Sequence, residues 1–152
     1  MTQTTPLTLR ALTSDDEEQW RALWRAYLAF YDTSLDEAVY ASTFARLLGD
    51  DPHDFSAIVA EQDGQLVGLA HYLFHRHGWK IEDCCYLQDL YAVPQVRGTG
   101  VGRSLIEAVY AAADAHGAPS VYWMTQTGNA QARQLYDRIG VLTDFIKYQR
   151  PS

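Results

Sequence analysis

The chain carries three glycines at alternate positions between two arginines. A strand-like run over residues 86–93 precedes this segment, and a helix-like run over residues 101–116 follows it. A glycine-rich turn between a strand and a helix presents free backbone N–H groups to a phosphate, and the missing Cβ atoms let the ligand approach. The segment therefore predicts a site for a phosphorylated cofactor, made by Arg97, Gly98, Thr99, Gly100, Val101, Gly102 and Arg103.

The spacing of these glycines narrows the choice of cofactor. Gly98-x-Gly100-x-Gly102 is not the G-x-G-x-x-G of a dinucleotide fold, and no βαβ unit opens the chain. The segment also lacks the Gly-Lys-Ser/Thr ending of a nucleoside-triphosphate loop. Neither of these two common nucleotide sites is indicated.

Two motifs instead resemble the GNAT superfamily of acyl-CoA-dependent N-acyltransferases. Gln95-x-x-Gly98-x-Gly100 is similar to its Q/R-x-x-G-x-G/A signature. The later run Asn129-x-x-Ala132-x-x-Leu135-Tyr136 is similar to its second recurring element, a helix that follows a strand. Residues 86–91 look like the branch of polyamine and small histone acetyltransferases. The resemblance covers residues 55–150 well and the N-terminal third loosely.

The elements expected around these motifs are of mixed α+β type in a single domain, residues 1–152. Two capping boxes, Ser14-x-x-Glu17 and Ser34-x-x-Glu37, predict the starts of two N-terminal helices. The resemblance implies a mostly antiparallel twisted sheet flanked by helices, in which parallel central strands, 84–92 and 120–126, splay apart. The strands expected from sequence pattern are 7–11, 55–61, 66–74, 86–93, 120–125 and one or two within 141–148, and the later helices are 101–116 and 129–139.

The same resemblance implies acetyl-CoA as the cofactor. Main-chain groups of Leu90, Tyr91 and Ala92 would lie along its pantetheine arm, and a backbone N–H near Leu90 or Tyr91 would polarise the thioester carbonyl. Asn129 would bind the arm or cap its own helix. Tyr136 would protonate the departing thiolate, although a helical tyrosine is also a common core residue.

A general base is needed as well, because a lysine-like amine is mostly protonated at neutral pH. The polyamine branch commonly has a glutamate where this chain has Gln88, which takes no proton. Asp89 is the nearest carboxylate and is the expected base, since a buried carboxylate usually has a partner or a role. Glu82, Asp83 and a water chain remain alternatives.

The acceptor pocket is expected where aromatic side chains meet polar and acidic ones that can hold an ammonium group. Helical aromatics such as Tyr27 and Tyr31 have a second interpretation as core residues. The histidines lack a third partner at metal-ligand spacing, so no metal site is expected. The residues expected to bind the acceptor are Tyr27, Tyr31, Asp32, Trp79, Glu82 and Gln88.

Composition limits the classes of partner. The formal net charge of −7 argues against nonspecific binding to nucleic acid or anionic lipid. No apolar run is long enough to span a bilayer, and the adjacent Cys84 and Cys85 suit neither a disulfide nor a metal, so a cytoplasmic protein is expected.

The sequence therefore predicts an enzyme that transfers an acetyl group from acetyl-CoA to a primary amine. The expected acceptor is a small polyamine-like or amino-acid-like molecule, whose amine attacks the thioester directly in a ternary complex. The alternatives are a protein lysine or N-terminal acetyltransferase and a non-catalytic acyl-CoA-binding module. The resemblance implies a homodimer.

Overall fold

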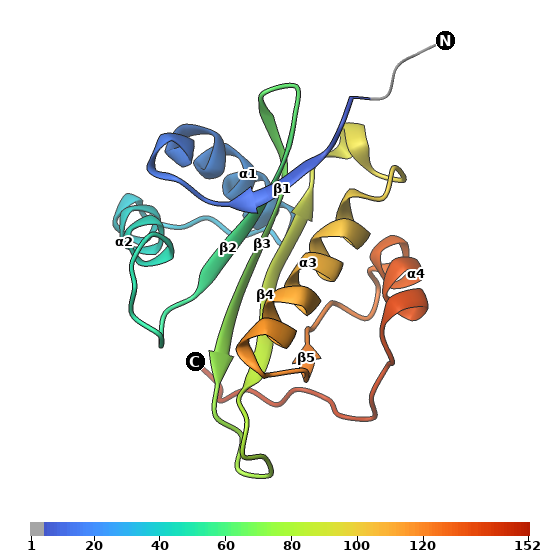
Figure 1. Ribbon diagram of the computed structural model, residues 1–152. Coiled ribbons are helices and arrows are strands. Elements are labelled where there is room, and N and C mark those ends of the chain that lie inside the picture. Colours follow the sequence, from blue (N-terminus) through green and yellow to red (C-terminus); the bar gives the residue numbers. More distant parts are fainter. Residues whose placement is uncertain (1–4) are drawn as a thin grey trace.

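The computed structural model describes residues 5–152 and contains a five-stranded sheet in the order β1-β2-β3-β4-β5 (Figure 1). Neighbouring strands are antiparallel except for β4 and β5, which are parallel. This arrangement confirms the predicted mixed α+β fold. The strands are β1 (Thr8–Ala11), β2 (Ser56–Gln62), β3 (Gln65–His75), β4 (Cys84–Ala92) and β5 (Val121–Tyr122).

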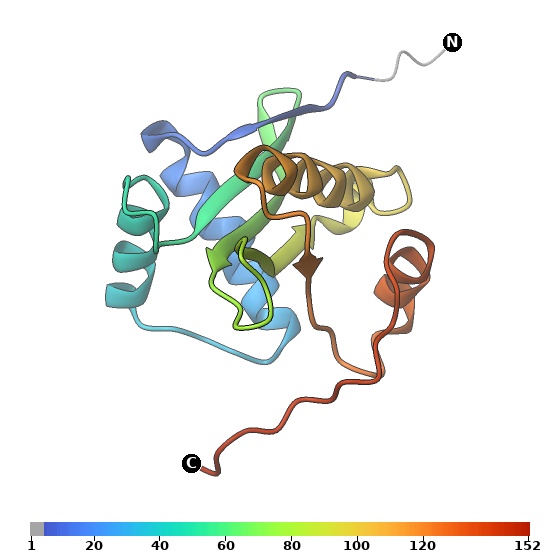
Figure 2. The same ribbon diagram turned by 60° about the horizontal axis from the view of Figure 1, so that its bottom comes forward.

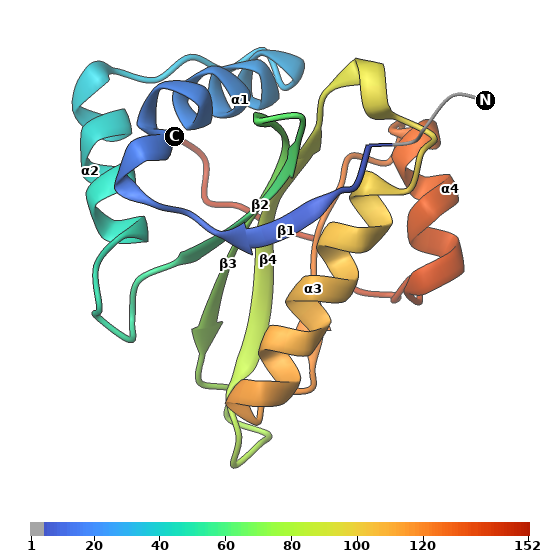
Figure 3. The same ribbon diagram turned by 45° about the horizontal axis from the view of Figure 1, so that its top comes forward.

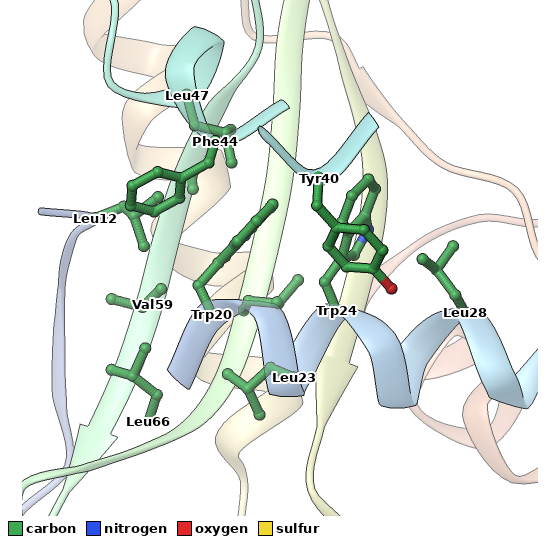
Figure 4. Close-up of a cluster of buried hydrophobic side chains, with 12 residues drawn as sticks. Leu12, Trp20, Leu23, Trp24, Leu28, Tyr40, Phe44, Leu47, Val59 and Leu66 are labelled. Atoms are coloured by element: carbon green, nitrogen blue, oxygen red, sulfur yellow. The ribbon is translucent and has the colours of Figure 1, made fainter. Parts of the chain in front are cut away.

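Helices cover both faces of the sheet (Figure 3). α1 (Glu17–Phe30) and α2 (Glu37–Leu47) lie on one face, and α3 (Val101–His116) lies on the other, with α4 (Ala130–Ile139) beside α3. The α1–α2 side holds an aromatic core in which Trp20 stacks on Trp24 with ring centroids 5.2 Å apart (Figure 4). The two cores fix α1 and α3 against β3 and β4, the strands that carry the candidate site.

Gly68 sets how closely α3 approaches the sheet. A Cβ atom at this position would lie 3.0 Å from both Leu105 Cδ1 and the Tyr91 carbonyl oxygen, and 3.1 Å from Val101 Cγ1. Only a residue without a side chain lets the first turns of α3 pack this tightly on β3. The glycine thereby positions the N-terminus of α3 beside the end of β4.

A register shift in β4 changes which way its side chains point. His71 pairs with Asp89, but the next residue of β3, Tyr72, pairs with Leu87, so Gln88 has no partner in the ladder. An extra residue of this kind is a β-bulge, and it reverses the alternation of side chains between the two faces. Beyond the bulge Asp89 faces α1, while Leu90 faces α3.

The parallel partner strand is much shorter than expected. The ladder between β4 and β5 contains only two pairs, Cys85 with Val121 and Tyr86 with Tyr122, whereas the sequence predicts a strand over 120–125. From Leu87 onward, β4 therefore has no neighbour on this side. The early end of β5 creates the splayed strands that the resemblance implies.

The two predicted capping boxes are wrong in position. The first helical segment, Ser14–Asp16, is capped by Thr13, whose backbone N–H donates to Asp16 Oδ2 at 2.8 Å. Arg10 also donates to both oxygens of Asp16, at 2.7 and 2.9 Å. The second helix begins after Asp36, without a side-chain cap, so Ser34 does not cap it. The Ser-x-x-Glu pattern alone does not determine the cap, and at the first helical segment the acid used is Asp16, which Arg10 also contacts.

Replacement of Asp16 by asparagine is expected to lower the free energy of unfolding by about 2 kcal/mol at pH 7. The Arg10 hydrogen bonds, against opposing burial, lower the pKa of Asp16 from 3.8 to about 2. A depressed pKa gives stability that is present above pH 4 or so and is lost as the pH falls through about 2. Urea titrations should show the full difference from wild type at pH 7 and only a small remainder of it near pH 2. Asp15→Asn, at the exposed neighbouring position, is the matched control.

The C-terminal segment, residues 141–152, contains no strand, so the predicted closing strands within 141–148 are absent. The segment runs away from α4 along one side of the molecule (Figure 2). Its apolar side chains are 74–90% exposed. A strand pattern becomes a strand only when it pairs with a sheet edge, and residues 141–152 pair with none here. The exposed apolar residues are Val141, Leu142, Phe145, Ile146 and Tyr148.

Candidate active site

The predicted phosphate turn lies between the end of β4 and the start of α3. Gly98 and Gly100 have φ values of 83° and 94°, in the left-handed region that favours glycine. A Cβ atom at either position would meet nothing within 4 Å, so the space above the turn is open. Gly100 caps α3, and the first N–H groups of a helix have no partner within it. The turn therefore offers backbone donors and a helix N-terminus to an anion.

The other residues of the turn hold its shape. Arg97 Nε donates to the Ala92 carbonyl at 3.1 Å, and its guanidinium lies 5.7 Å from the Tyr91 ring centroid. Arg103 pairs with Glu107 at 2.9 Å. Thr99 donates its hydroxyl to the Val96 carbonyl. Both arginines still border the cleft described below, where their charge favours an anion.

The third glycine has a packing role in addition to its place in the cleft. A Cβ atom at Gly102 would lie 3.3 Å from Leu135 Cδ2, so this position lets α3 and α4 approach each other.

The open edge of β4 presents backbone groups of alternate residues. The Val93 N–H donates to Val67 O on β3 at 2.9 Å. Because backbone groups alternate along a strand, Tyr91 points the same way, while Leu90 and Ala92 point toward the gap left by β5. The sequence leaves Leu90 and Tyr91 as candidates for the N–H that polarises the thioester carbonyl. Of these two, only Leu90 directs its N–H toward the gap.

Tyr136 enters the gap from α4. Its ring packs edge-on against Trp123, with centroids 5.5 Å apart, and a Cβ atom at Gly140 would lie 2.9 Å from the Trp123 ring. Gly140 thus makes room for Trp123, which supports Tyr136. Burial first, and then the neighbouring Tyr31, raise the pKa of Tyr136 to about 12. The phenol is therefore protonated at neutral pH and can donate.

Asn129 precedes α4 but does not cap it with its side chain. The Asn129 amide instead donates to Thr125 Oγ1 at 3.1 Å. Because Asn129 lines the cleft, its polar side chain is available to a bound molecule as well.

These elements enclose a cleft of about 510 Å³ that extends from the phosphate turn along β4 to Tyr136. This volume is within the range usual for cofactor and ligand sites. Every residue predicted to bind the cofactor lines it except Thr99. Phe30, which the sequence also suggests for the acceptor pocket, lines the cleft, as do Ala132 and Leu135 of the second motif. The sequence interpretation missed four further lining residues, which stand out in no motif: Val96, Gln131, Gln134 and Arg138.

Only some of the residues predicted to bind the acceptor border the cleft or the recess beside it. Tyr27 and Tyr31 line the main cleft, and a small recess continues from them between Gln88, Trp123 and Met124. Asp32 is exposed and borders neither space.

Trp79 and Glu82 lie in the β3–β4 loop, at the opposite end of β4 from the phosphate turn (Figure 1). The Trp79 side chain is 85% exposed, and neither residue borders the cleft. Their prediction as acceptor-binding residues is not supported by this placement. The hairpin connection alone puts this loop at the start of β4, whereas the site forms at its end.

Asp89 is buried below the acceptor end of the cleft, only 8% exposed. Its Oδ2 accepts from Trp24 Nε1 at 3.2 Å and lies 2.8 Å from His71 Nδ1. Asp89 is thus separated from the cleft by neighbouring side chains, and it borders neither the cleft nor the recess.

Side chains that commonly bind metals do not cluster in the described part of the chain. Among residues 5–152, no three His, Cys, Asp or Glu side chains gather as a metal site would require. Within the same residues no helix combines the length and the apolar character needed to cross a membrane.

The fold combines a mixed α+β sheet with a cleft between its splayed strands. Residues 14–141 match the acetyltransferase (GNAT) family, and the chain belongs to this family. It is accordingly an N-acetyltransferase.

Two relatives agree with this assignment, and a solved structure has a similar fold. The D-amino-acid N-acetyltransferase HPA3 of Saccharomyces cerevisiae is 38% identical over 145 residues, which cover 95% of this chain and 90% of that protein. An uncharacterised N-acetyltransferase of Bacillus subtilis, YhfO, is 27% identical over 93% of this chain and 95% of its own length. The fold is similar to the structure of AAC(6')-Iy in complex with the bisubstrate analogue CoA-S-monomethyl-acetylneamine, with a TM-score of 0.84, 18% identity, and coverage of 97% and 99% of the two chains.

Proposed function

We propose that this protein transfers the acetyl group of acetyl-CoA to the primary amine of a small polyamine-like or amino-acid-like molecule. The observation that carries the proposal is the continuous cleft joining the α3 N-terminus, the open edge of β4 and Tyr136. The yeast relative's name, a D-amino-acid N-acetyltransferase, supports a small amine as the acceptor. The resemblance of residues 86–91 to the polyamine and small histone acetyltransferase branch supports the same choice.

The residues present fit CoA. Gly98 and Gly100 leave the space above the turn open, and the helix N-terminus favours the charge of a pyrophosphate. Leu90 and Ala92 offer strand-like partners to the two amides of the pantetheine arm. Acetyl-CoA, when bound, supplies an activated acetyl thioester.

The chain's own groups act on that thioester in two ways. The Leu90 N–H polarises the carbonyl and stabilises negative charge on its oxygen. Tyr136 donates a proton to the leaving sulfur. Because the pKa of Tyr136 is about 12 and that of an ordinary thiol about 8.5, this donation is favourable only when Tyr136 regains a proton from the acceptor nitrogen. Tyr136 thus passes a proton from the acceptor nitrogen to the leaving sulfur.

Direct attack by the amine fits the state of the cysteines. Cys84 and Cys85 are 3% and 0% exposed, and burial, together with the neighbouring Cys84, raises the pKa of Cys85 to about 11. A thiol that is buried and protonated is a poor nucleophile. Neither cysteine borders the cleft, which favours a ternary complex over a covalent enzyme intermediate.

An amine panel tests the proposal. Thiol release from acetyl-CoA is measured with polyamines, D- and L-amino acids, an aminoglycoside and a lysine peptide, and products are identified by mass spectrometry. We expect acceptor-dependent release with at least one class of small amine. Transfer to the peptide alone would favour a protein acetyltransferase. CoA binding by calorimetry without acceptor-dependent release would favour a non-catalytic binding module.

We also propose that the protein forms a homodimer through its C-terminal segment. Residues 141–148 carry five exposed apolar side chains in strand-like sequence, and β5 is an edge strand with a free side. One chain thus has both an unpaired segment with a strand-like sequence and an unpaired sheet edge, and a second copy offers the complement of each.

Phe145→Glu combined with Ile146→Glu is expected to convert a dimer into a monomer, because two charges would have to be buried in the apolar contact. Light scattering coupled to gel filtration measures the mass. Lys147→Glu changes the charge of an adjacent exposed residue and should leave the dimer intact. A monomeric wild-type protein at micromolar concentration would contradict the proposal.

A further inference from the structure

A buried carboxylate lies beneath the acceptor end of the cleft without a buried cation beside it. In residues 5–152, the groups that face Asp89 are His71 from β3, Trp24 and Tyr27 from α1, and Tyr86 from its own strand. The nearby arginines of α1, Arg21 and Arg25, lie over the Tyr40 ring instead, each 5.6 Å from its centroid. A buried charge without an opposite charge is costly and calls for a functional explanation.

The hydrogen-bond pattern fixes the state of His71. Trp20 Nε1 lies 3.0 Å from His71 Nε2, and an indole nitrogen only donates. His71 Nε2 must therefore accept, so the imidazole proton is on Nδ1, which donates to Asp89 Oδ2 at 2.8 Å. Because Nε2 accepts and so carries no proton, the His71 imidazole has no charge with which to neutralise the carboxylate.

Tyr27 connects this carboxylate to the cleft. Trp20, Trp24 and Tyr27 share one face of α1 at helical spacing, and Tyr27 is the one that lines the cleft. Burial, and then the charge of the nearby Asp89, raise the pKa of Tyr27 well above its usual range. The phenol therefore keeps its proton at neutral pH, and its oxygen lone pairs can accept a proton from a molecule in the cleft.

We propose that Tyr27 and Asp89 form a proton relay for the acceptor amine, with His71 and Trp24 as positioning residues. The inference rests on the proposed amine acetyltransferase function. An N–H bond of the ammonium breaks as Tyr27 Oη accepts its proton, and the Tyr27 hydroxyl proton passes to Asp89. The nitrogen keeps the electron pair with which it attacks the thioester carbonyl carbon. Asp89 returns the proton to solvent through Tyr27 after the product leaves.

The relay also explains how Gln88 can occupy the position where a carboxylate was expected. Gln88 lies in the bulge and borders the recess, where it can hydrogen-bond an acceptor without taking its proton. The base is the next residue along, and the bulge turns it to the α1 face beneath Tyr27. The proposed base is therefore Asp89, one residue after Gln88, and the Tyr27 side chain lies between it and the cleft.

Tyr27→Phe tests the relay, because it keeps the ring that packs against Tyr31 and Tyr91 and removes only the hydroxyl. For an amine of pKa about 10, we expect kcat/KM at pH 7 to fall by about a hundredfold, within the usual range for one acid–base group. The loss should shrink to a few-fold near pH 10, where much of the amine is already neutral. Affinity for CoA, measured by calorimetry, should be unchanged.

Tyr40→Phe is the matched control, because Tyr40 is buried in the same aromatic cluster and does not border the cleft. It should leave kcat/KM and its pH profile unchanged. An acceptor that is uncharged at pH 7, such as an arylamine, should react with the Tyr27→Phe variant at nearly the wild-type rate. A purely structural role for the hydroxyl would depress the reaction of both kinds of acceptor equally.

The outcomes separate the relay from the proposed function. A wild-type enzyme that acetylates small amines, with a Tyr27→Phe profile parallel to it between pH 6.5 and 10, would overturn the relay and leave the function standing. A wild-type protein that binds CoA but acetylates no amine in the panel would overturn both. Asp89→Asn provides a second variant, and a folded Asp89→Asn protein should show the same pH-dependent loss.

Discussion

Replacement of Gly100 by aspartate is expected to abolish binding of CoA. The new carboxylate would stand at the N-terminus of α3, in the open space above the turn where phosphate oxygens are expected. Two unit charges about 4 Å apart near a protein surface repel by about 4 kcal/mol, which corresponds to about a thousandfold loss of affinity. Isothermal titration calorimetry with CoA at moderate salt measures the effect.

Backbone strain contributes separately, because Gly100 has a φ of 94°. Gly117 is the matched control, since it caps the other end of α3 with a φ of 80°, and a Cβ atom added there would also meet nothing within 4 Å. Gly117→Asp should cost similar stability and leave CoA affinity unchanged. Gly100→Ala, which adds strain without charge, should weaken binding far less than Gly100→Asp. Unchanged affinity in a folded Gly100→Asp protein would rule out the phosphate turn.

The parts of the site that could be predicted from sequence are those that local chemistry determines. The glycine turn and α3 follow from a proline, positive-φ glycines and an apolar stripe, and the predicted helix over 101–116 has the observed bounds. The predicted cofactor residues between 90 and 103 are near neighbours in the chain, and Asn129 and Tyr136 come from the second motif; all of them but Thr99 border one cleft. In the glycine turn, the order of residues in the chain already determines most of the local geometry of the site.

The buried relay could not be read in the same way, because it depends on distant contacts. His71 is 18 positions from Asp89, and Trp20 is 51 from His71. Their meeting depends on the register of β3 with β4 and on the bulge at Gln88, and neither leaves a clear mark in the sequence. From the sequence, the histidines could be considered only as possible metal ligands, and the tryptophans only as core residues.

The acceptor residues show a third kind of limit. Trp79 and Glu82 have suitable chemistry, but they lie before β4 while the cleft lies at its end. Chain direction alone separates them from Tyr27 and Tyr31. The apolar pattern of residues 141–148 is typical of strands, yet no strand forms there, because strand pattern specifies an apolar face and not which edge it joins.

Tyr136→Phe is expected to lower kcat by about tenfold to a thousandfold, close to the range for loss of one acid–base group. The substitution keeps the ring against Trp123 and removes only the hydroxyl. The KM for acetyl-CoA should change little, because the turn and β4 provide most of the binding groups. Since the pKa of Tyr136 is about 12, its proton is present throughout the range in which the amine titrates. The loss of kcat should therefore be independent of pH, unlike the loss in Tyr27→Phe.

Tyr110→Phe distinguishes a missing proton donor from a displaced helix. The Tyr110 hydroxyl donates to the Ile139 carbonyl at the end of α4 at 2.8 Å, and Tyr110 does not border the cleft. Its removal should cost about 1 kcal/mol of stability with little change in kcat. If Tyr110→Phe lowered kcat as much as Tyr136→Phe, the position of α4 would explain both results. A near-normal kcat in Tyr136→Phe, with chemistry shown to limit the rate, would make Tyr136 a packing residue and leave protonation of the sulfur to solvent.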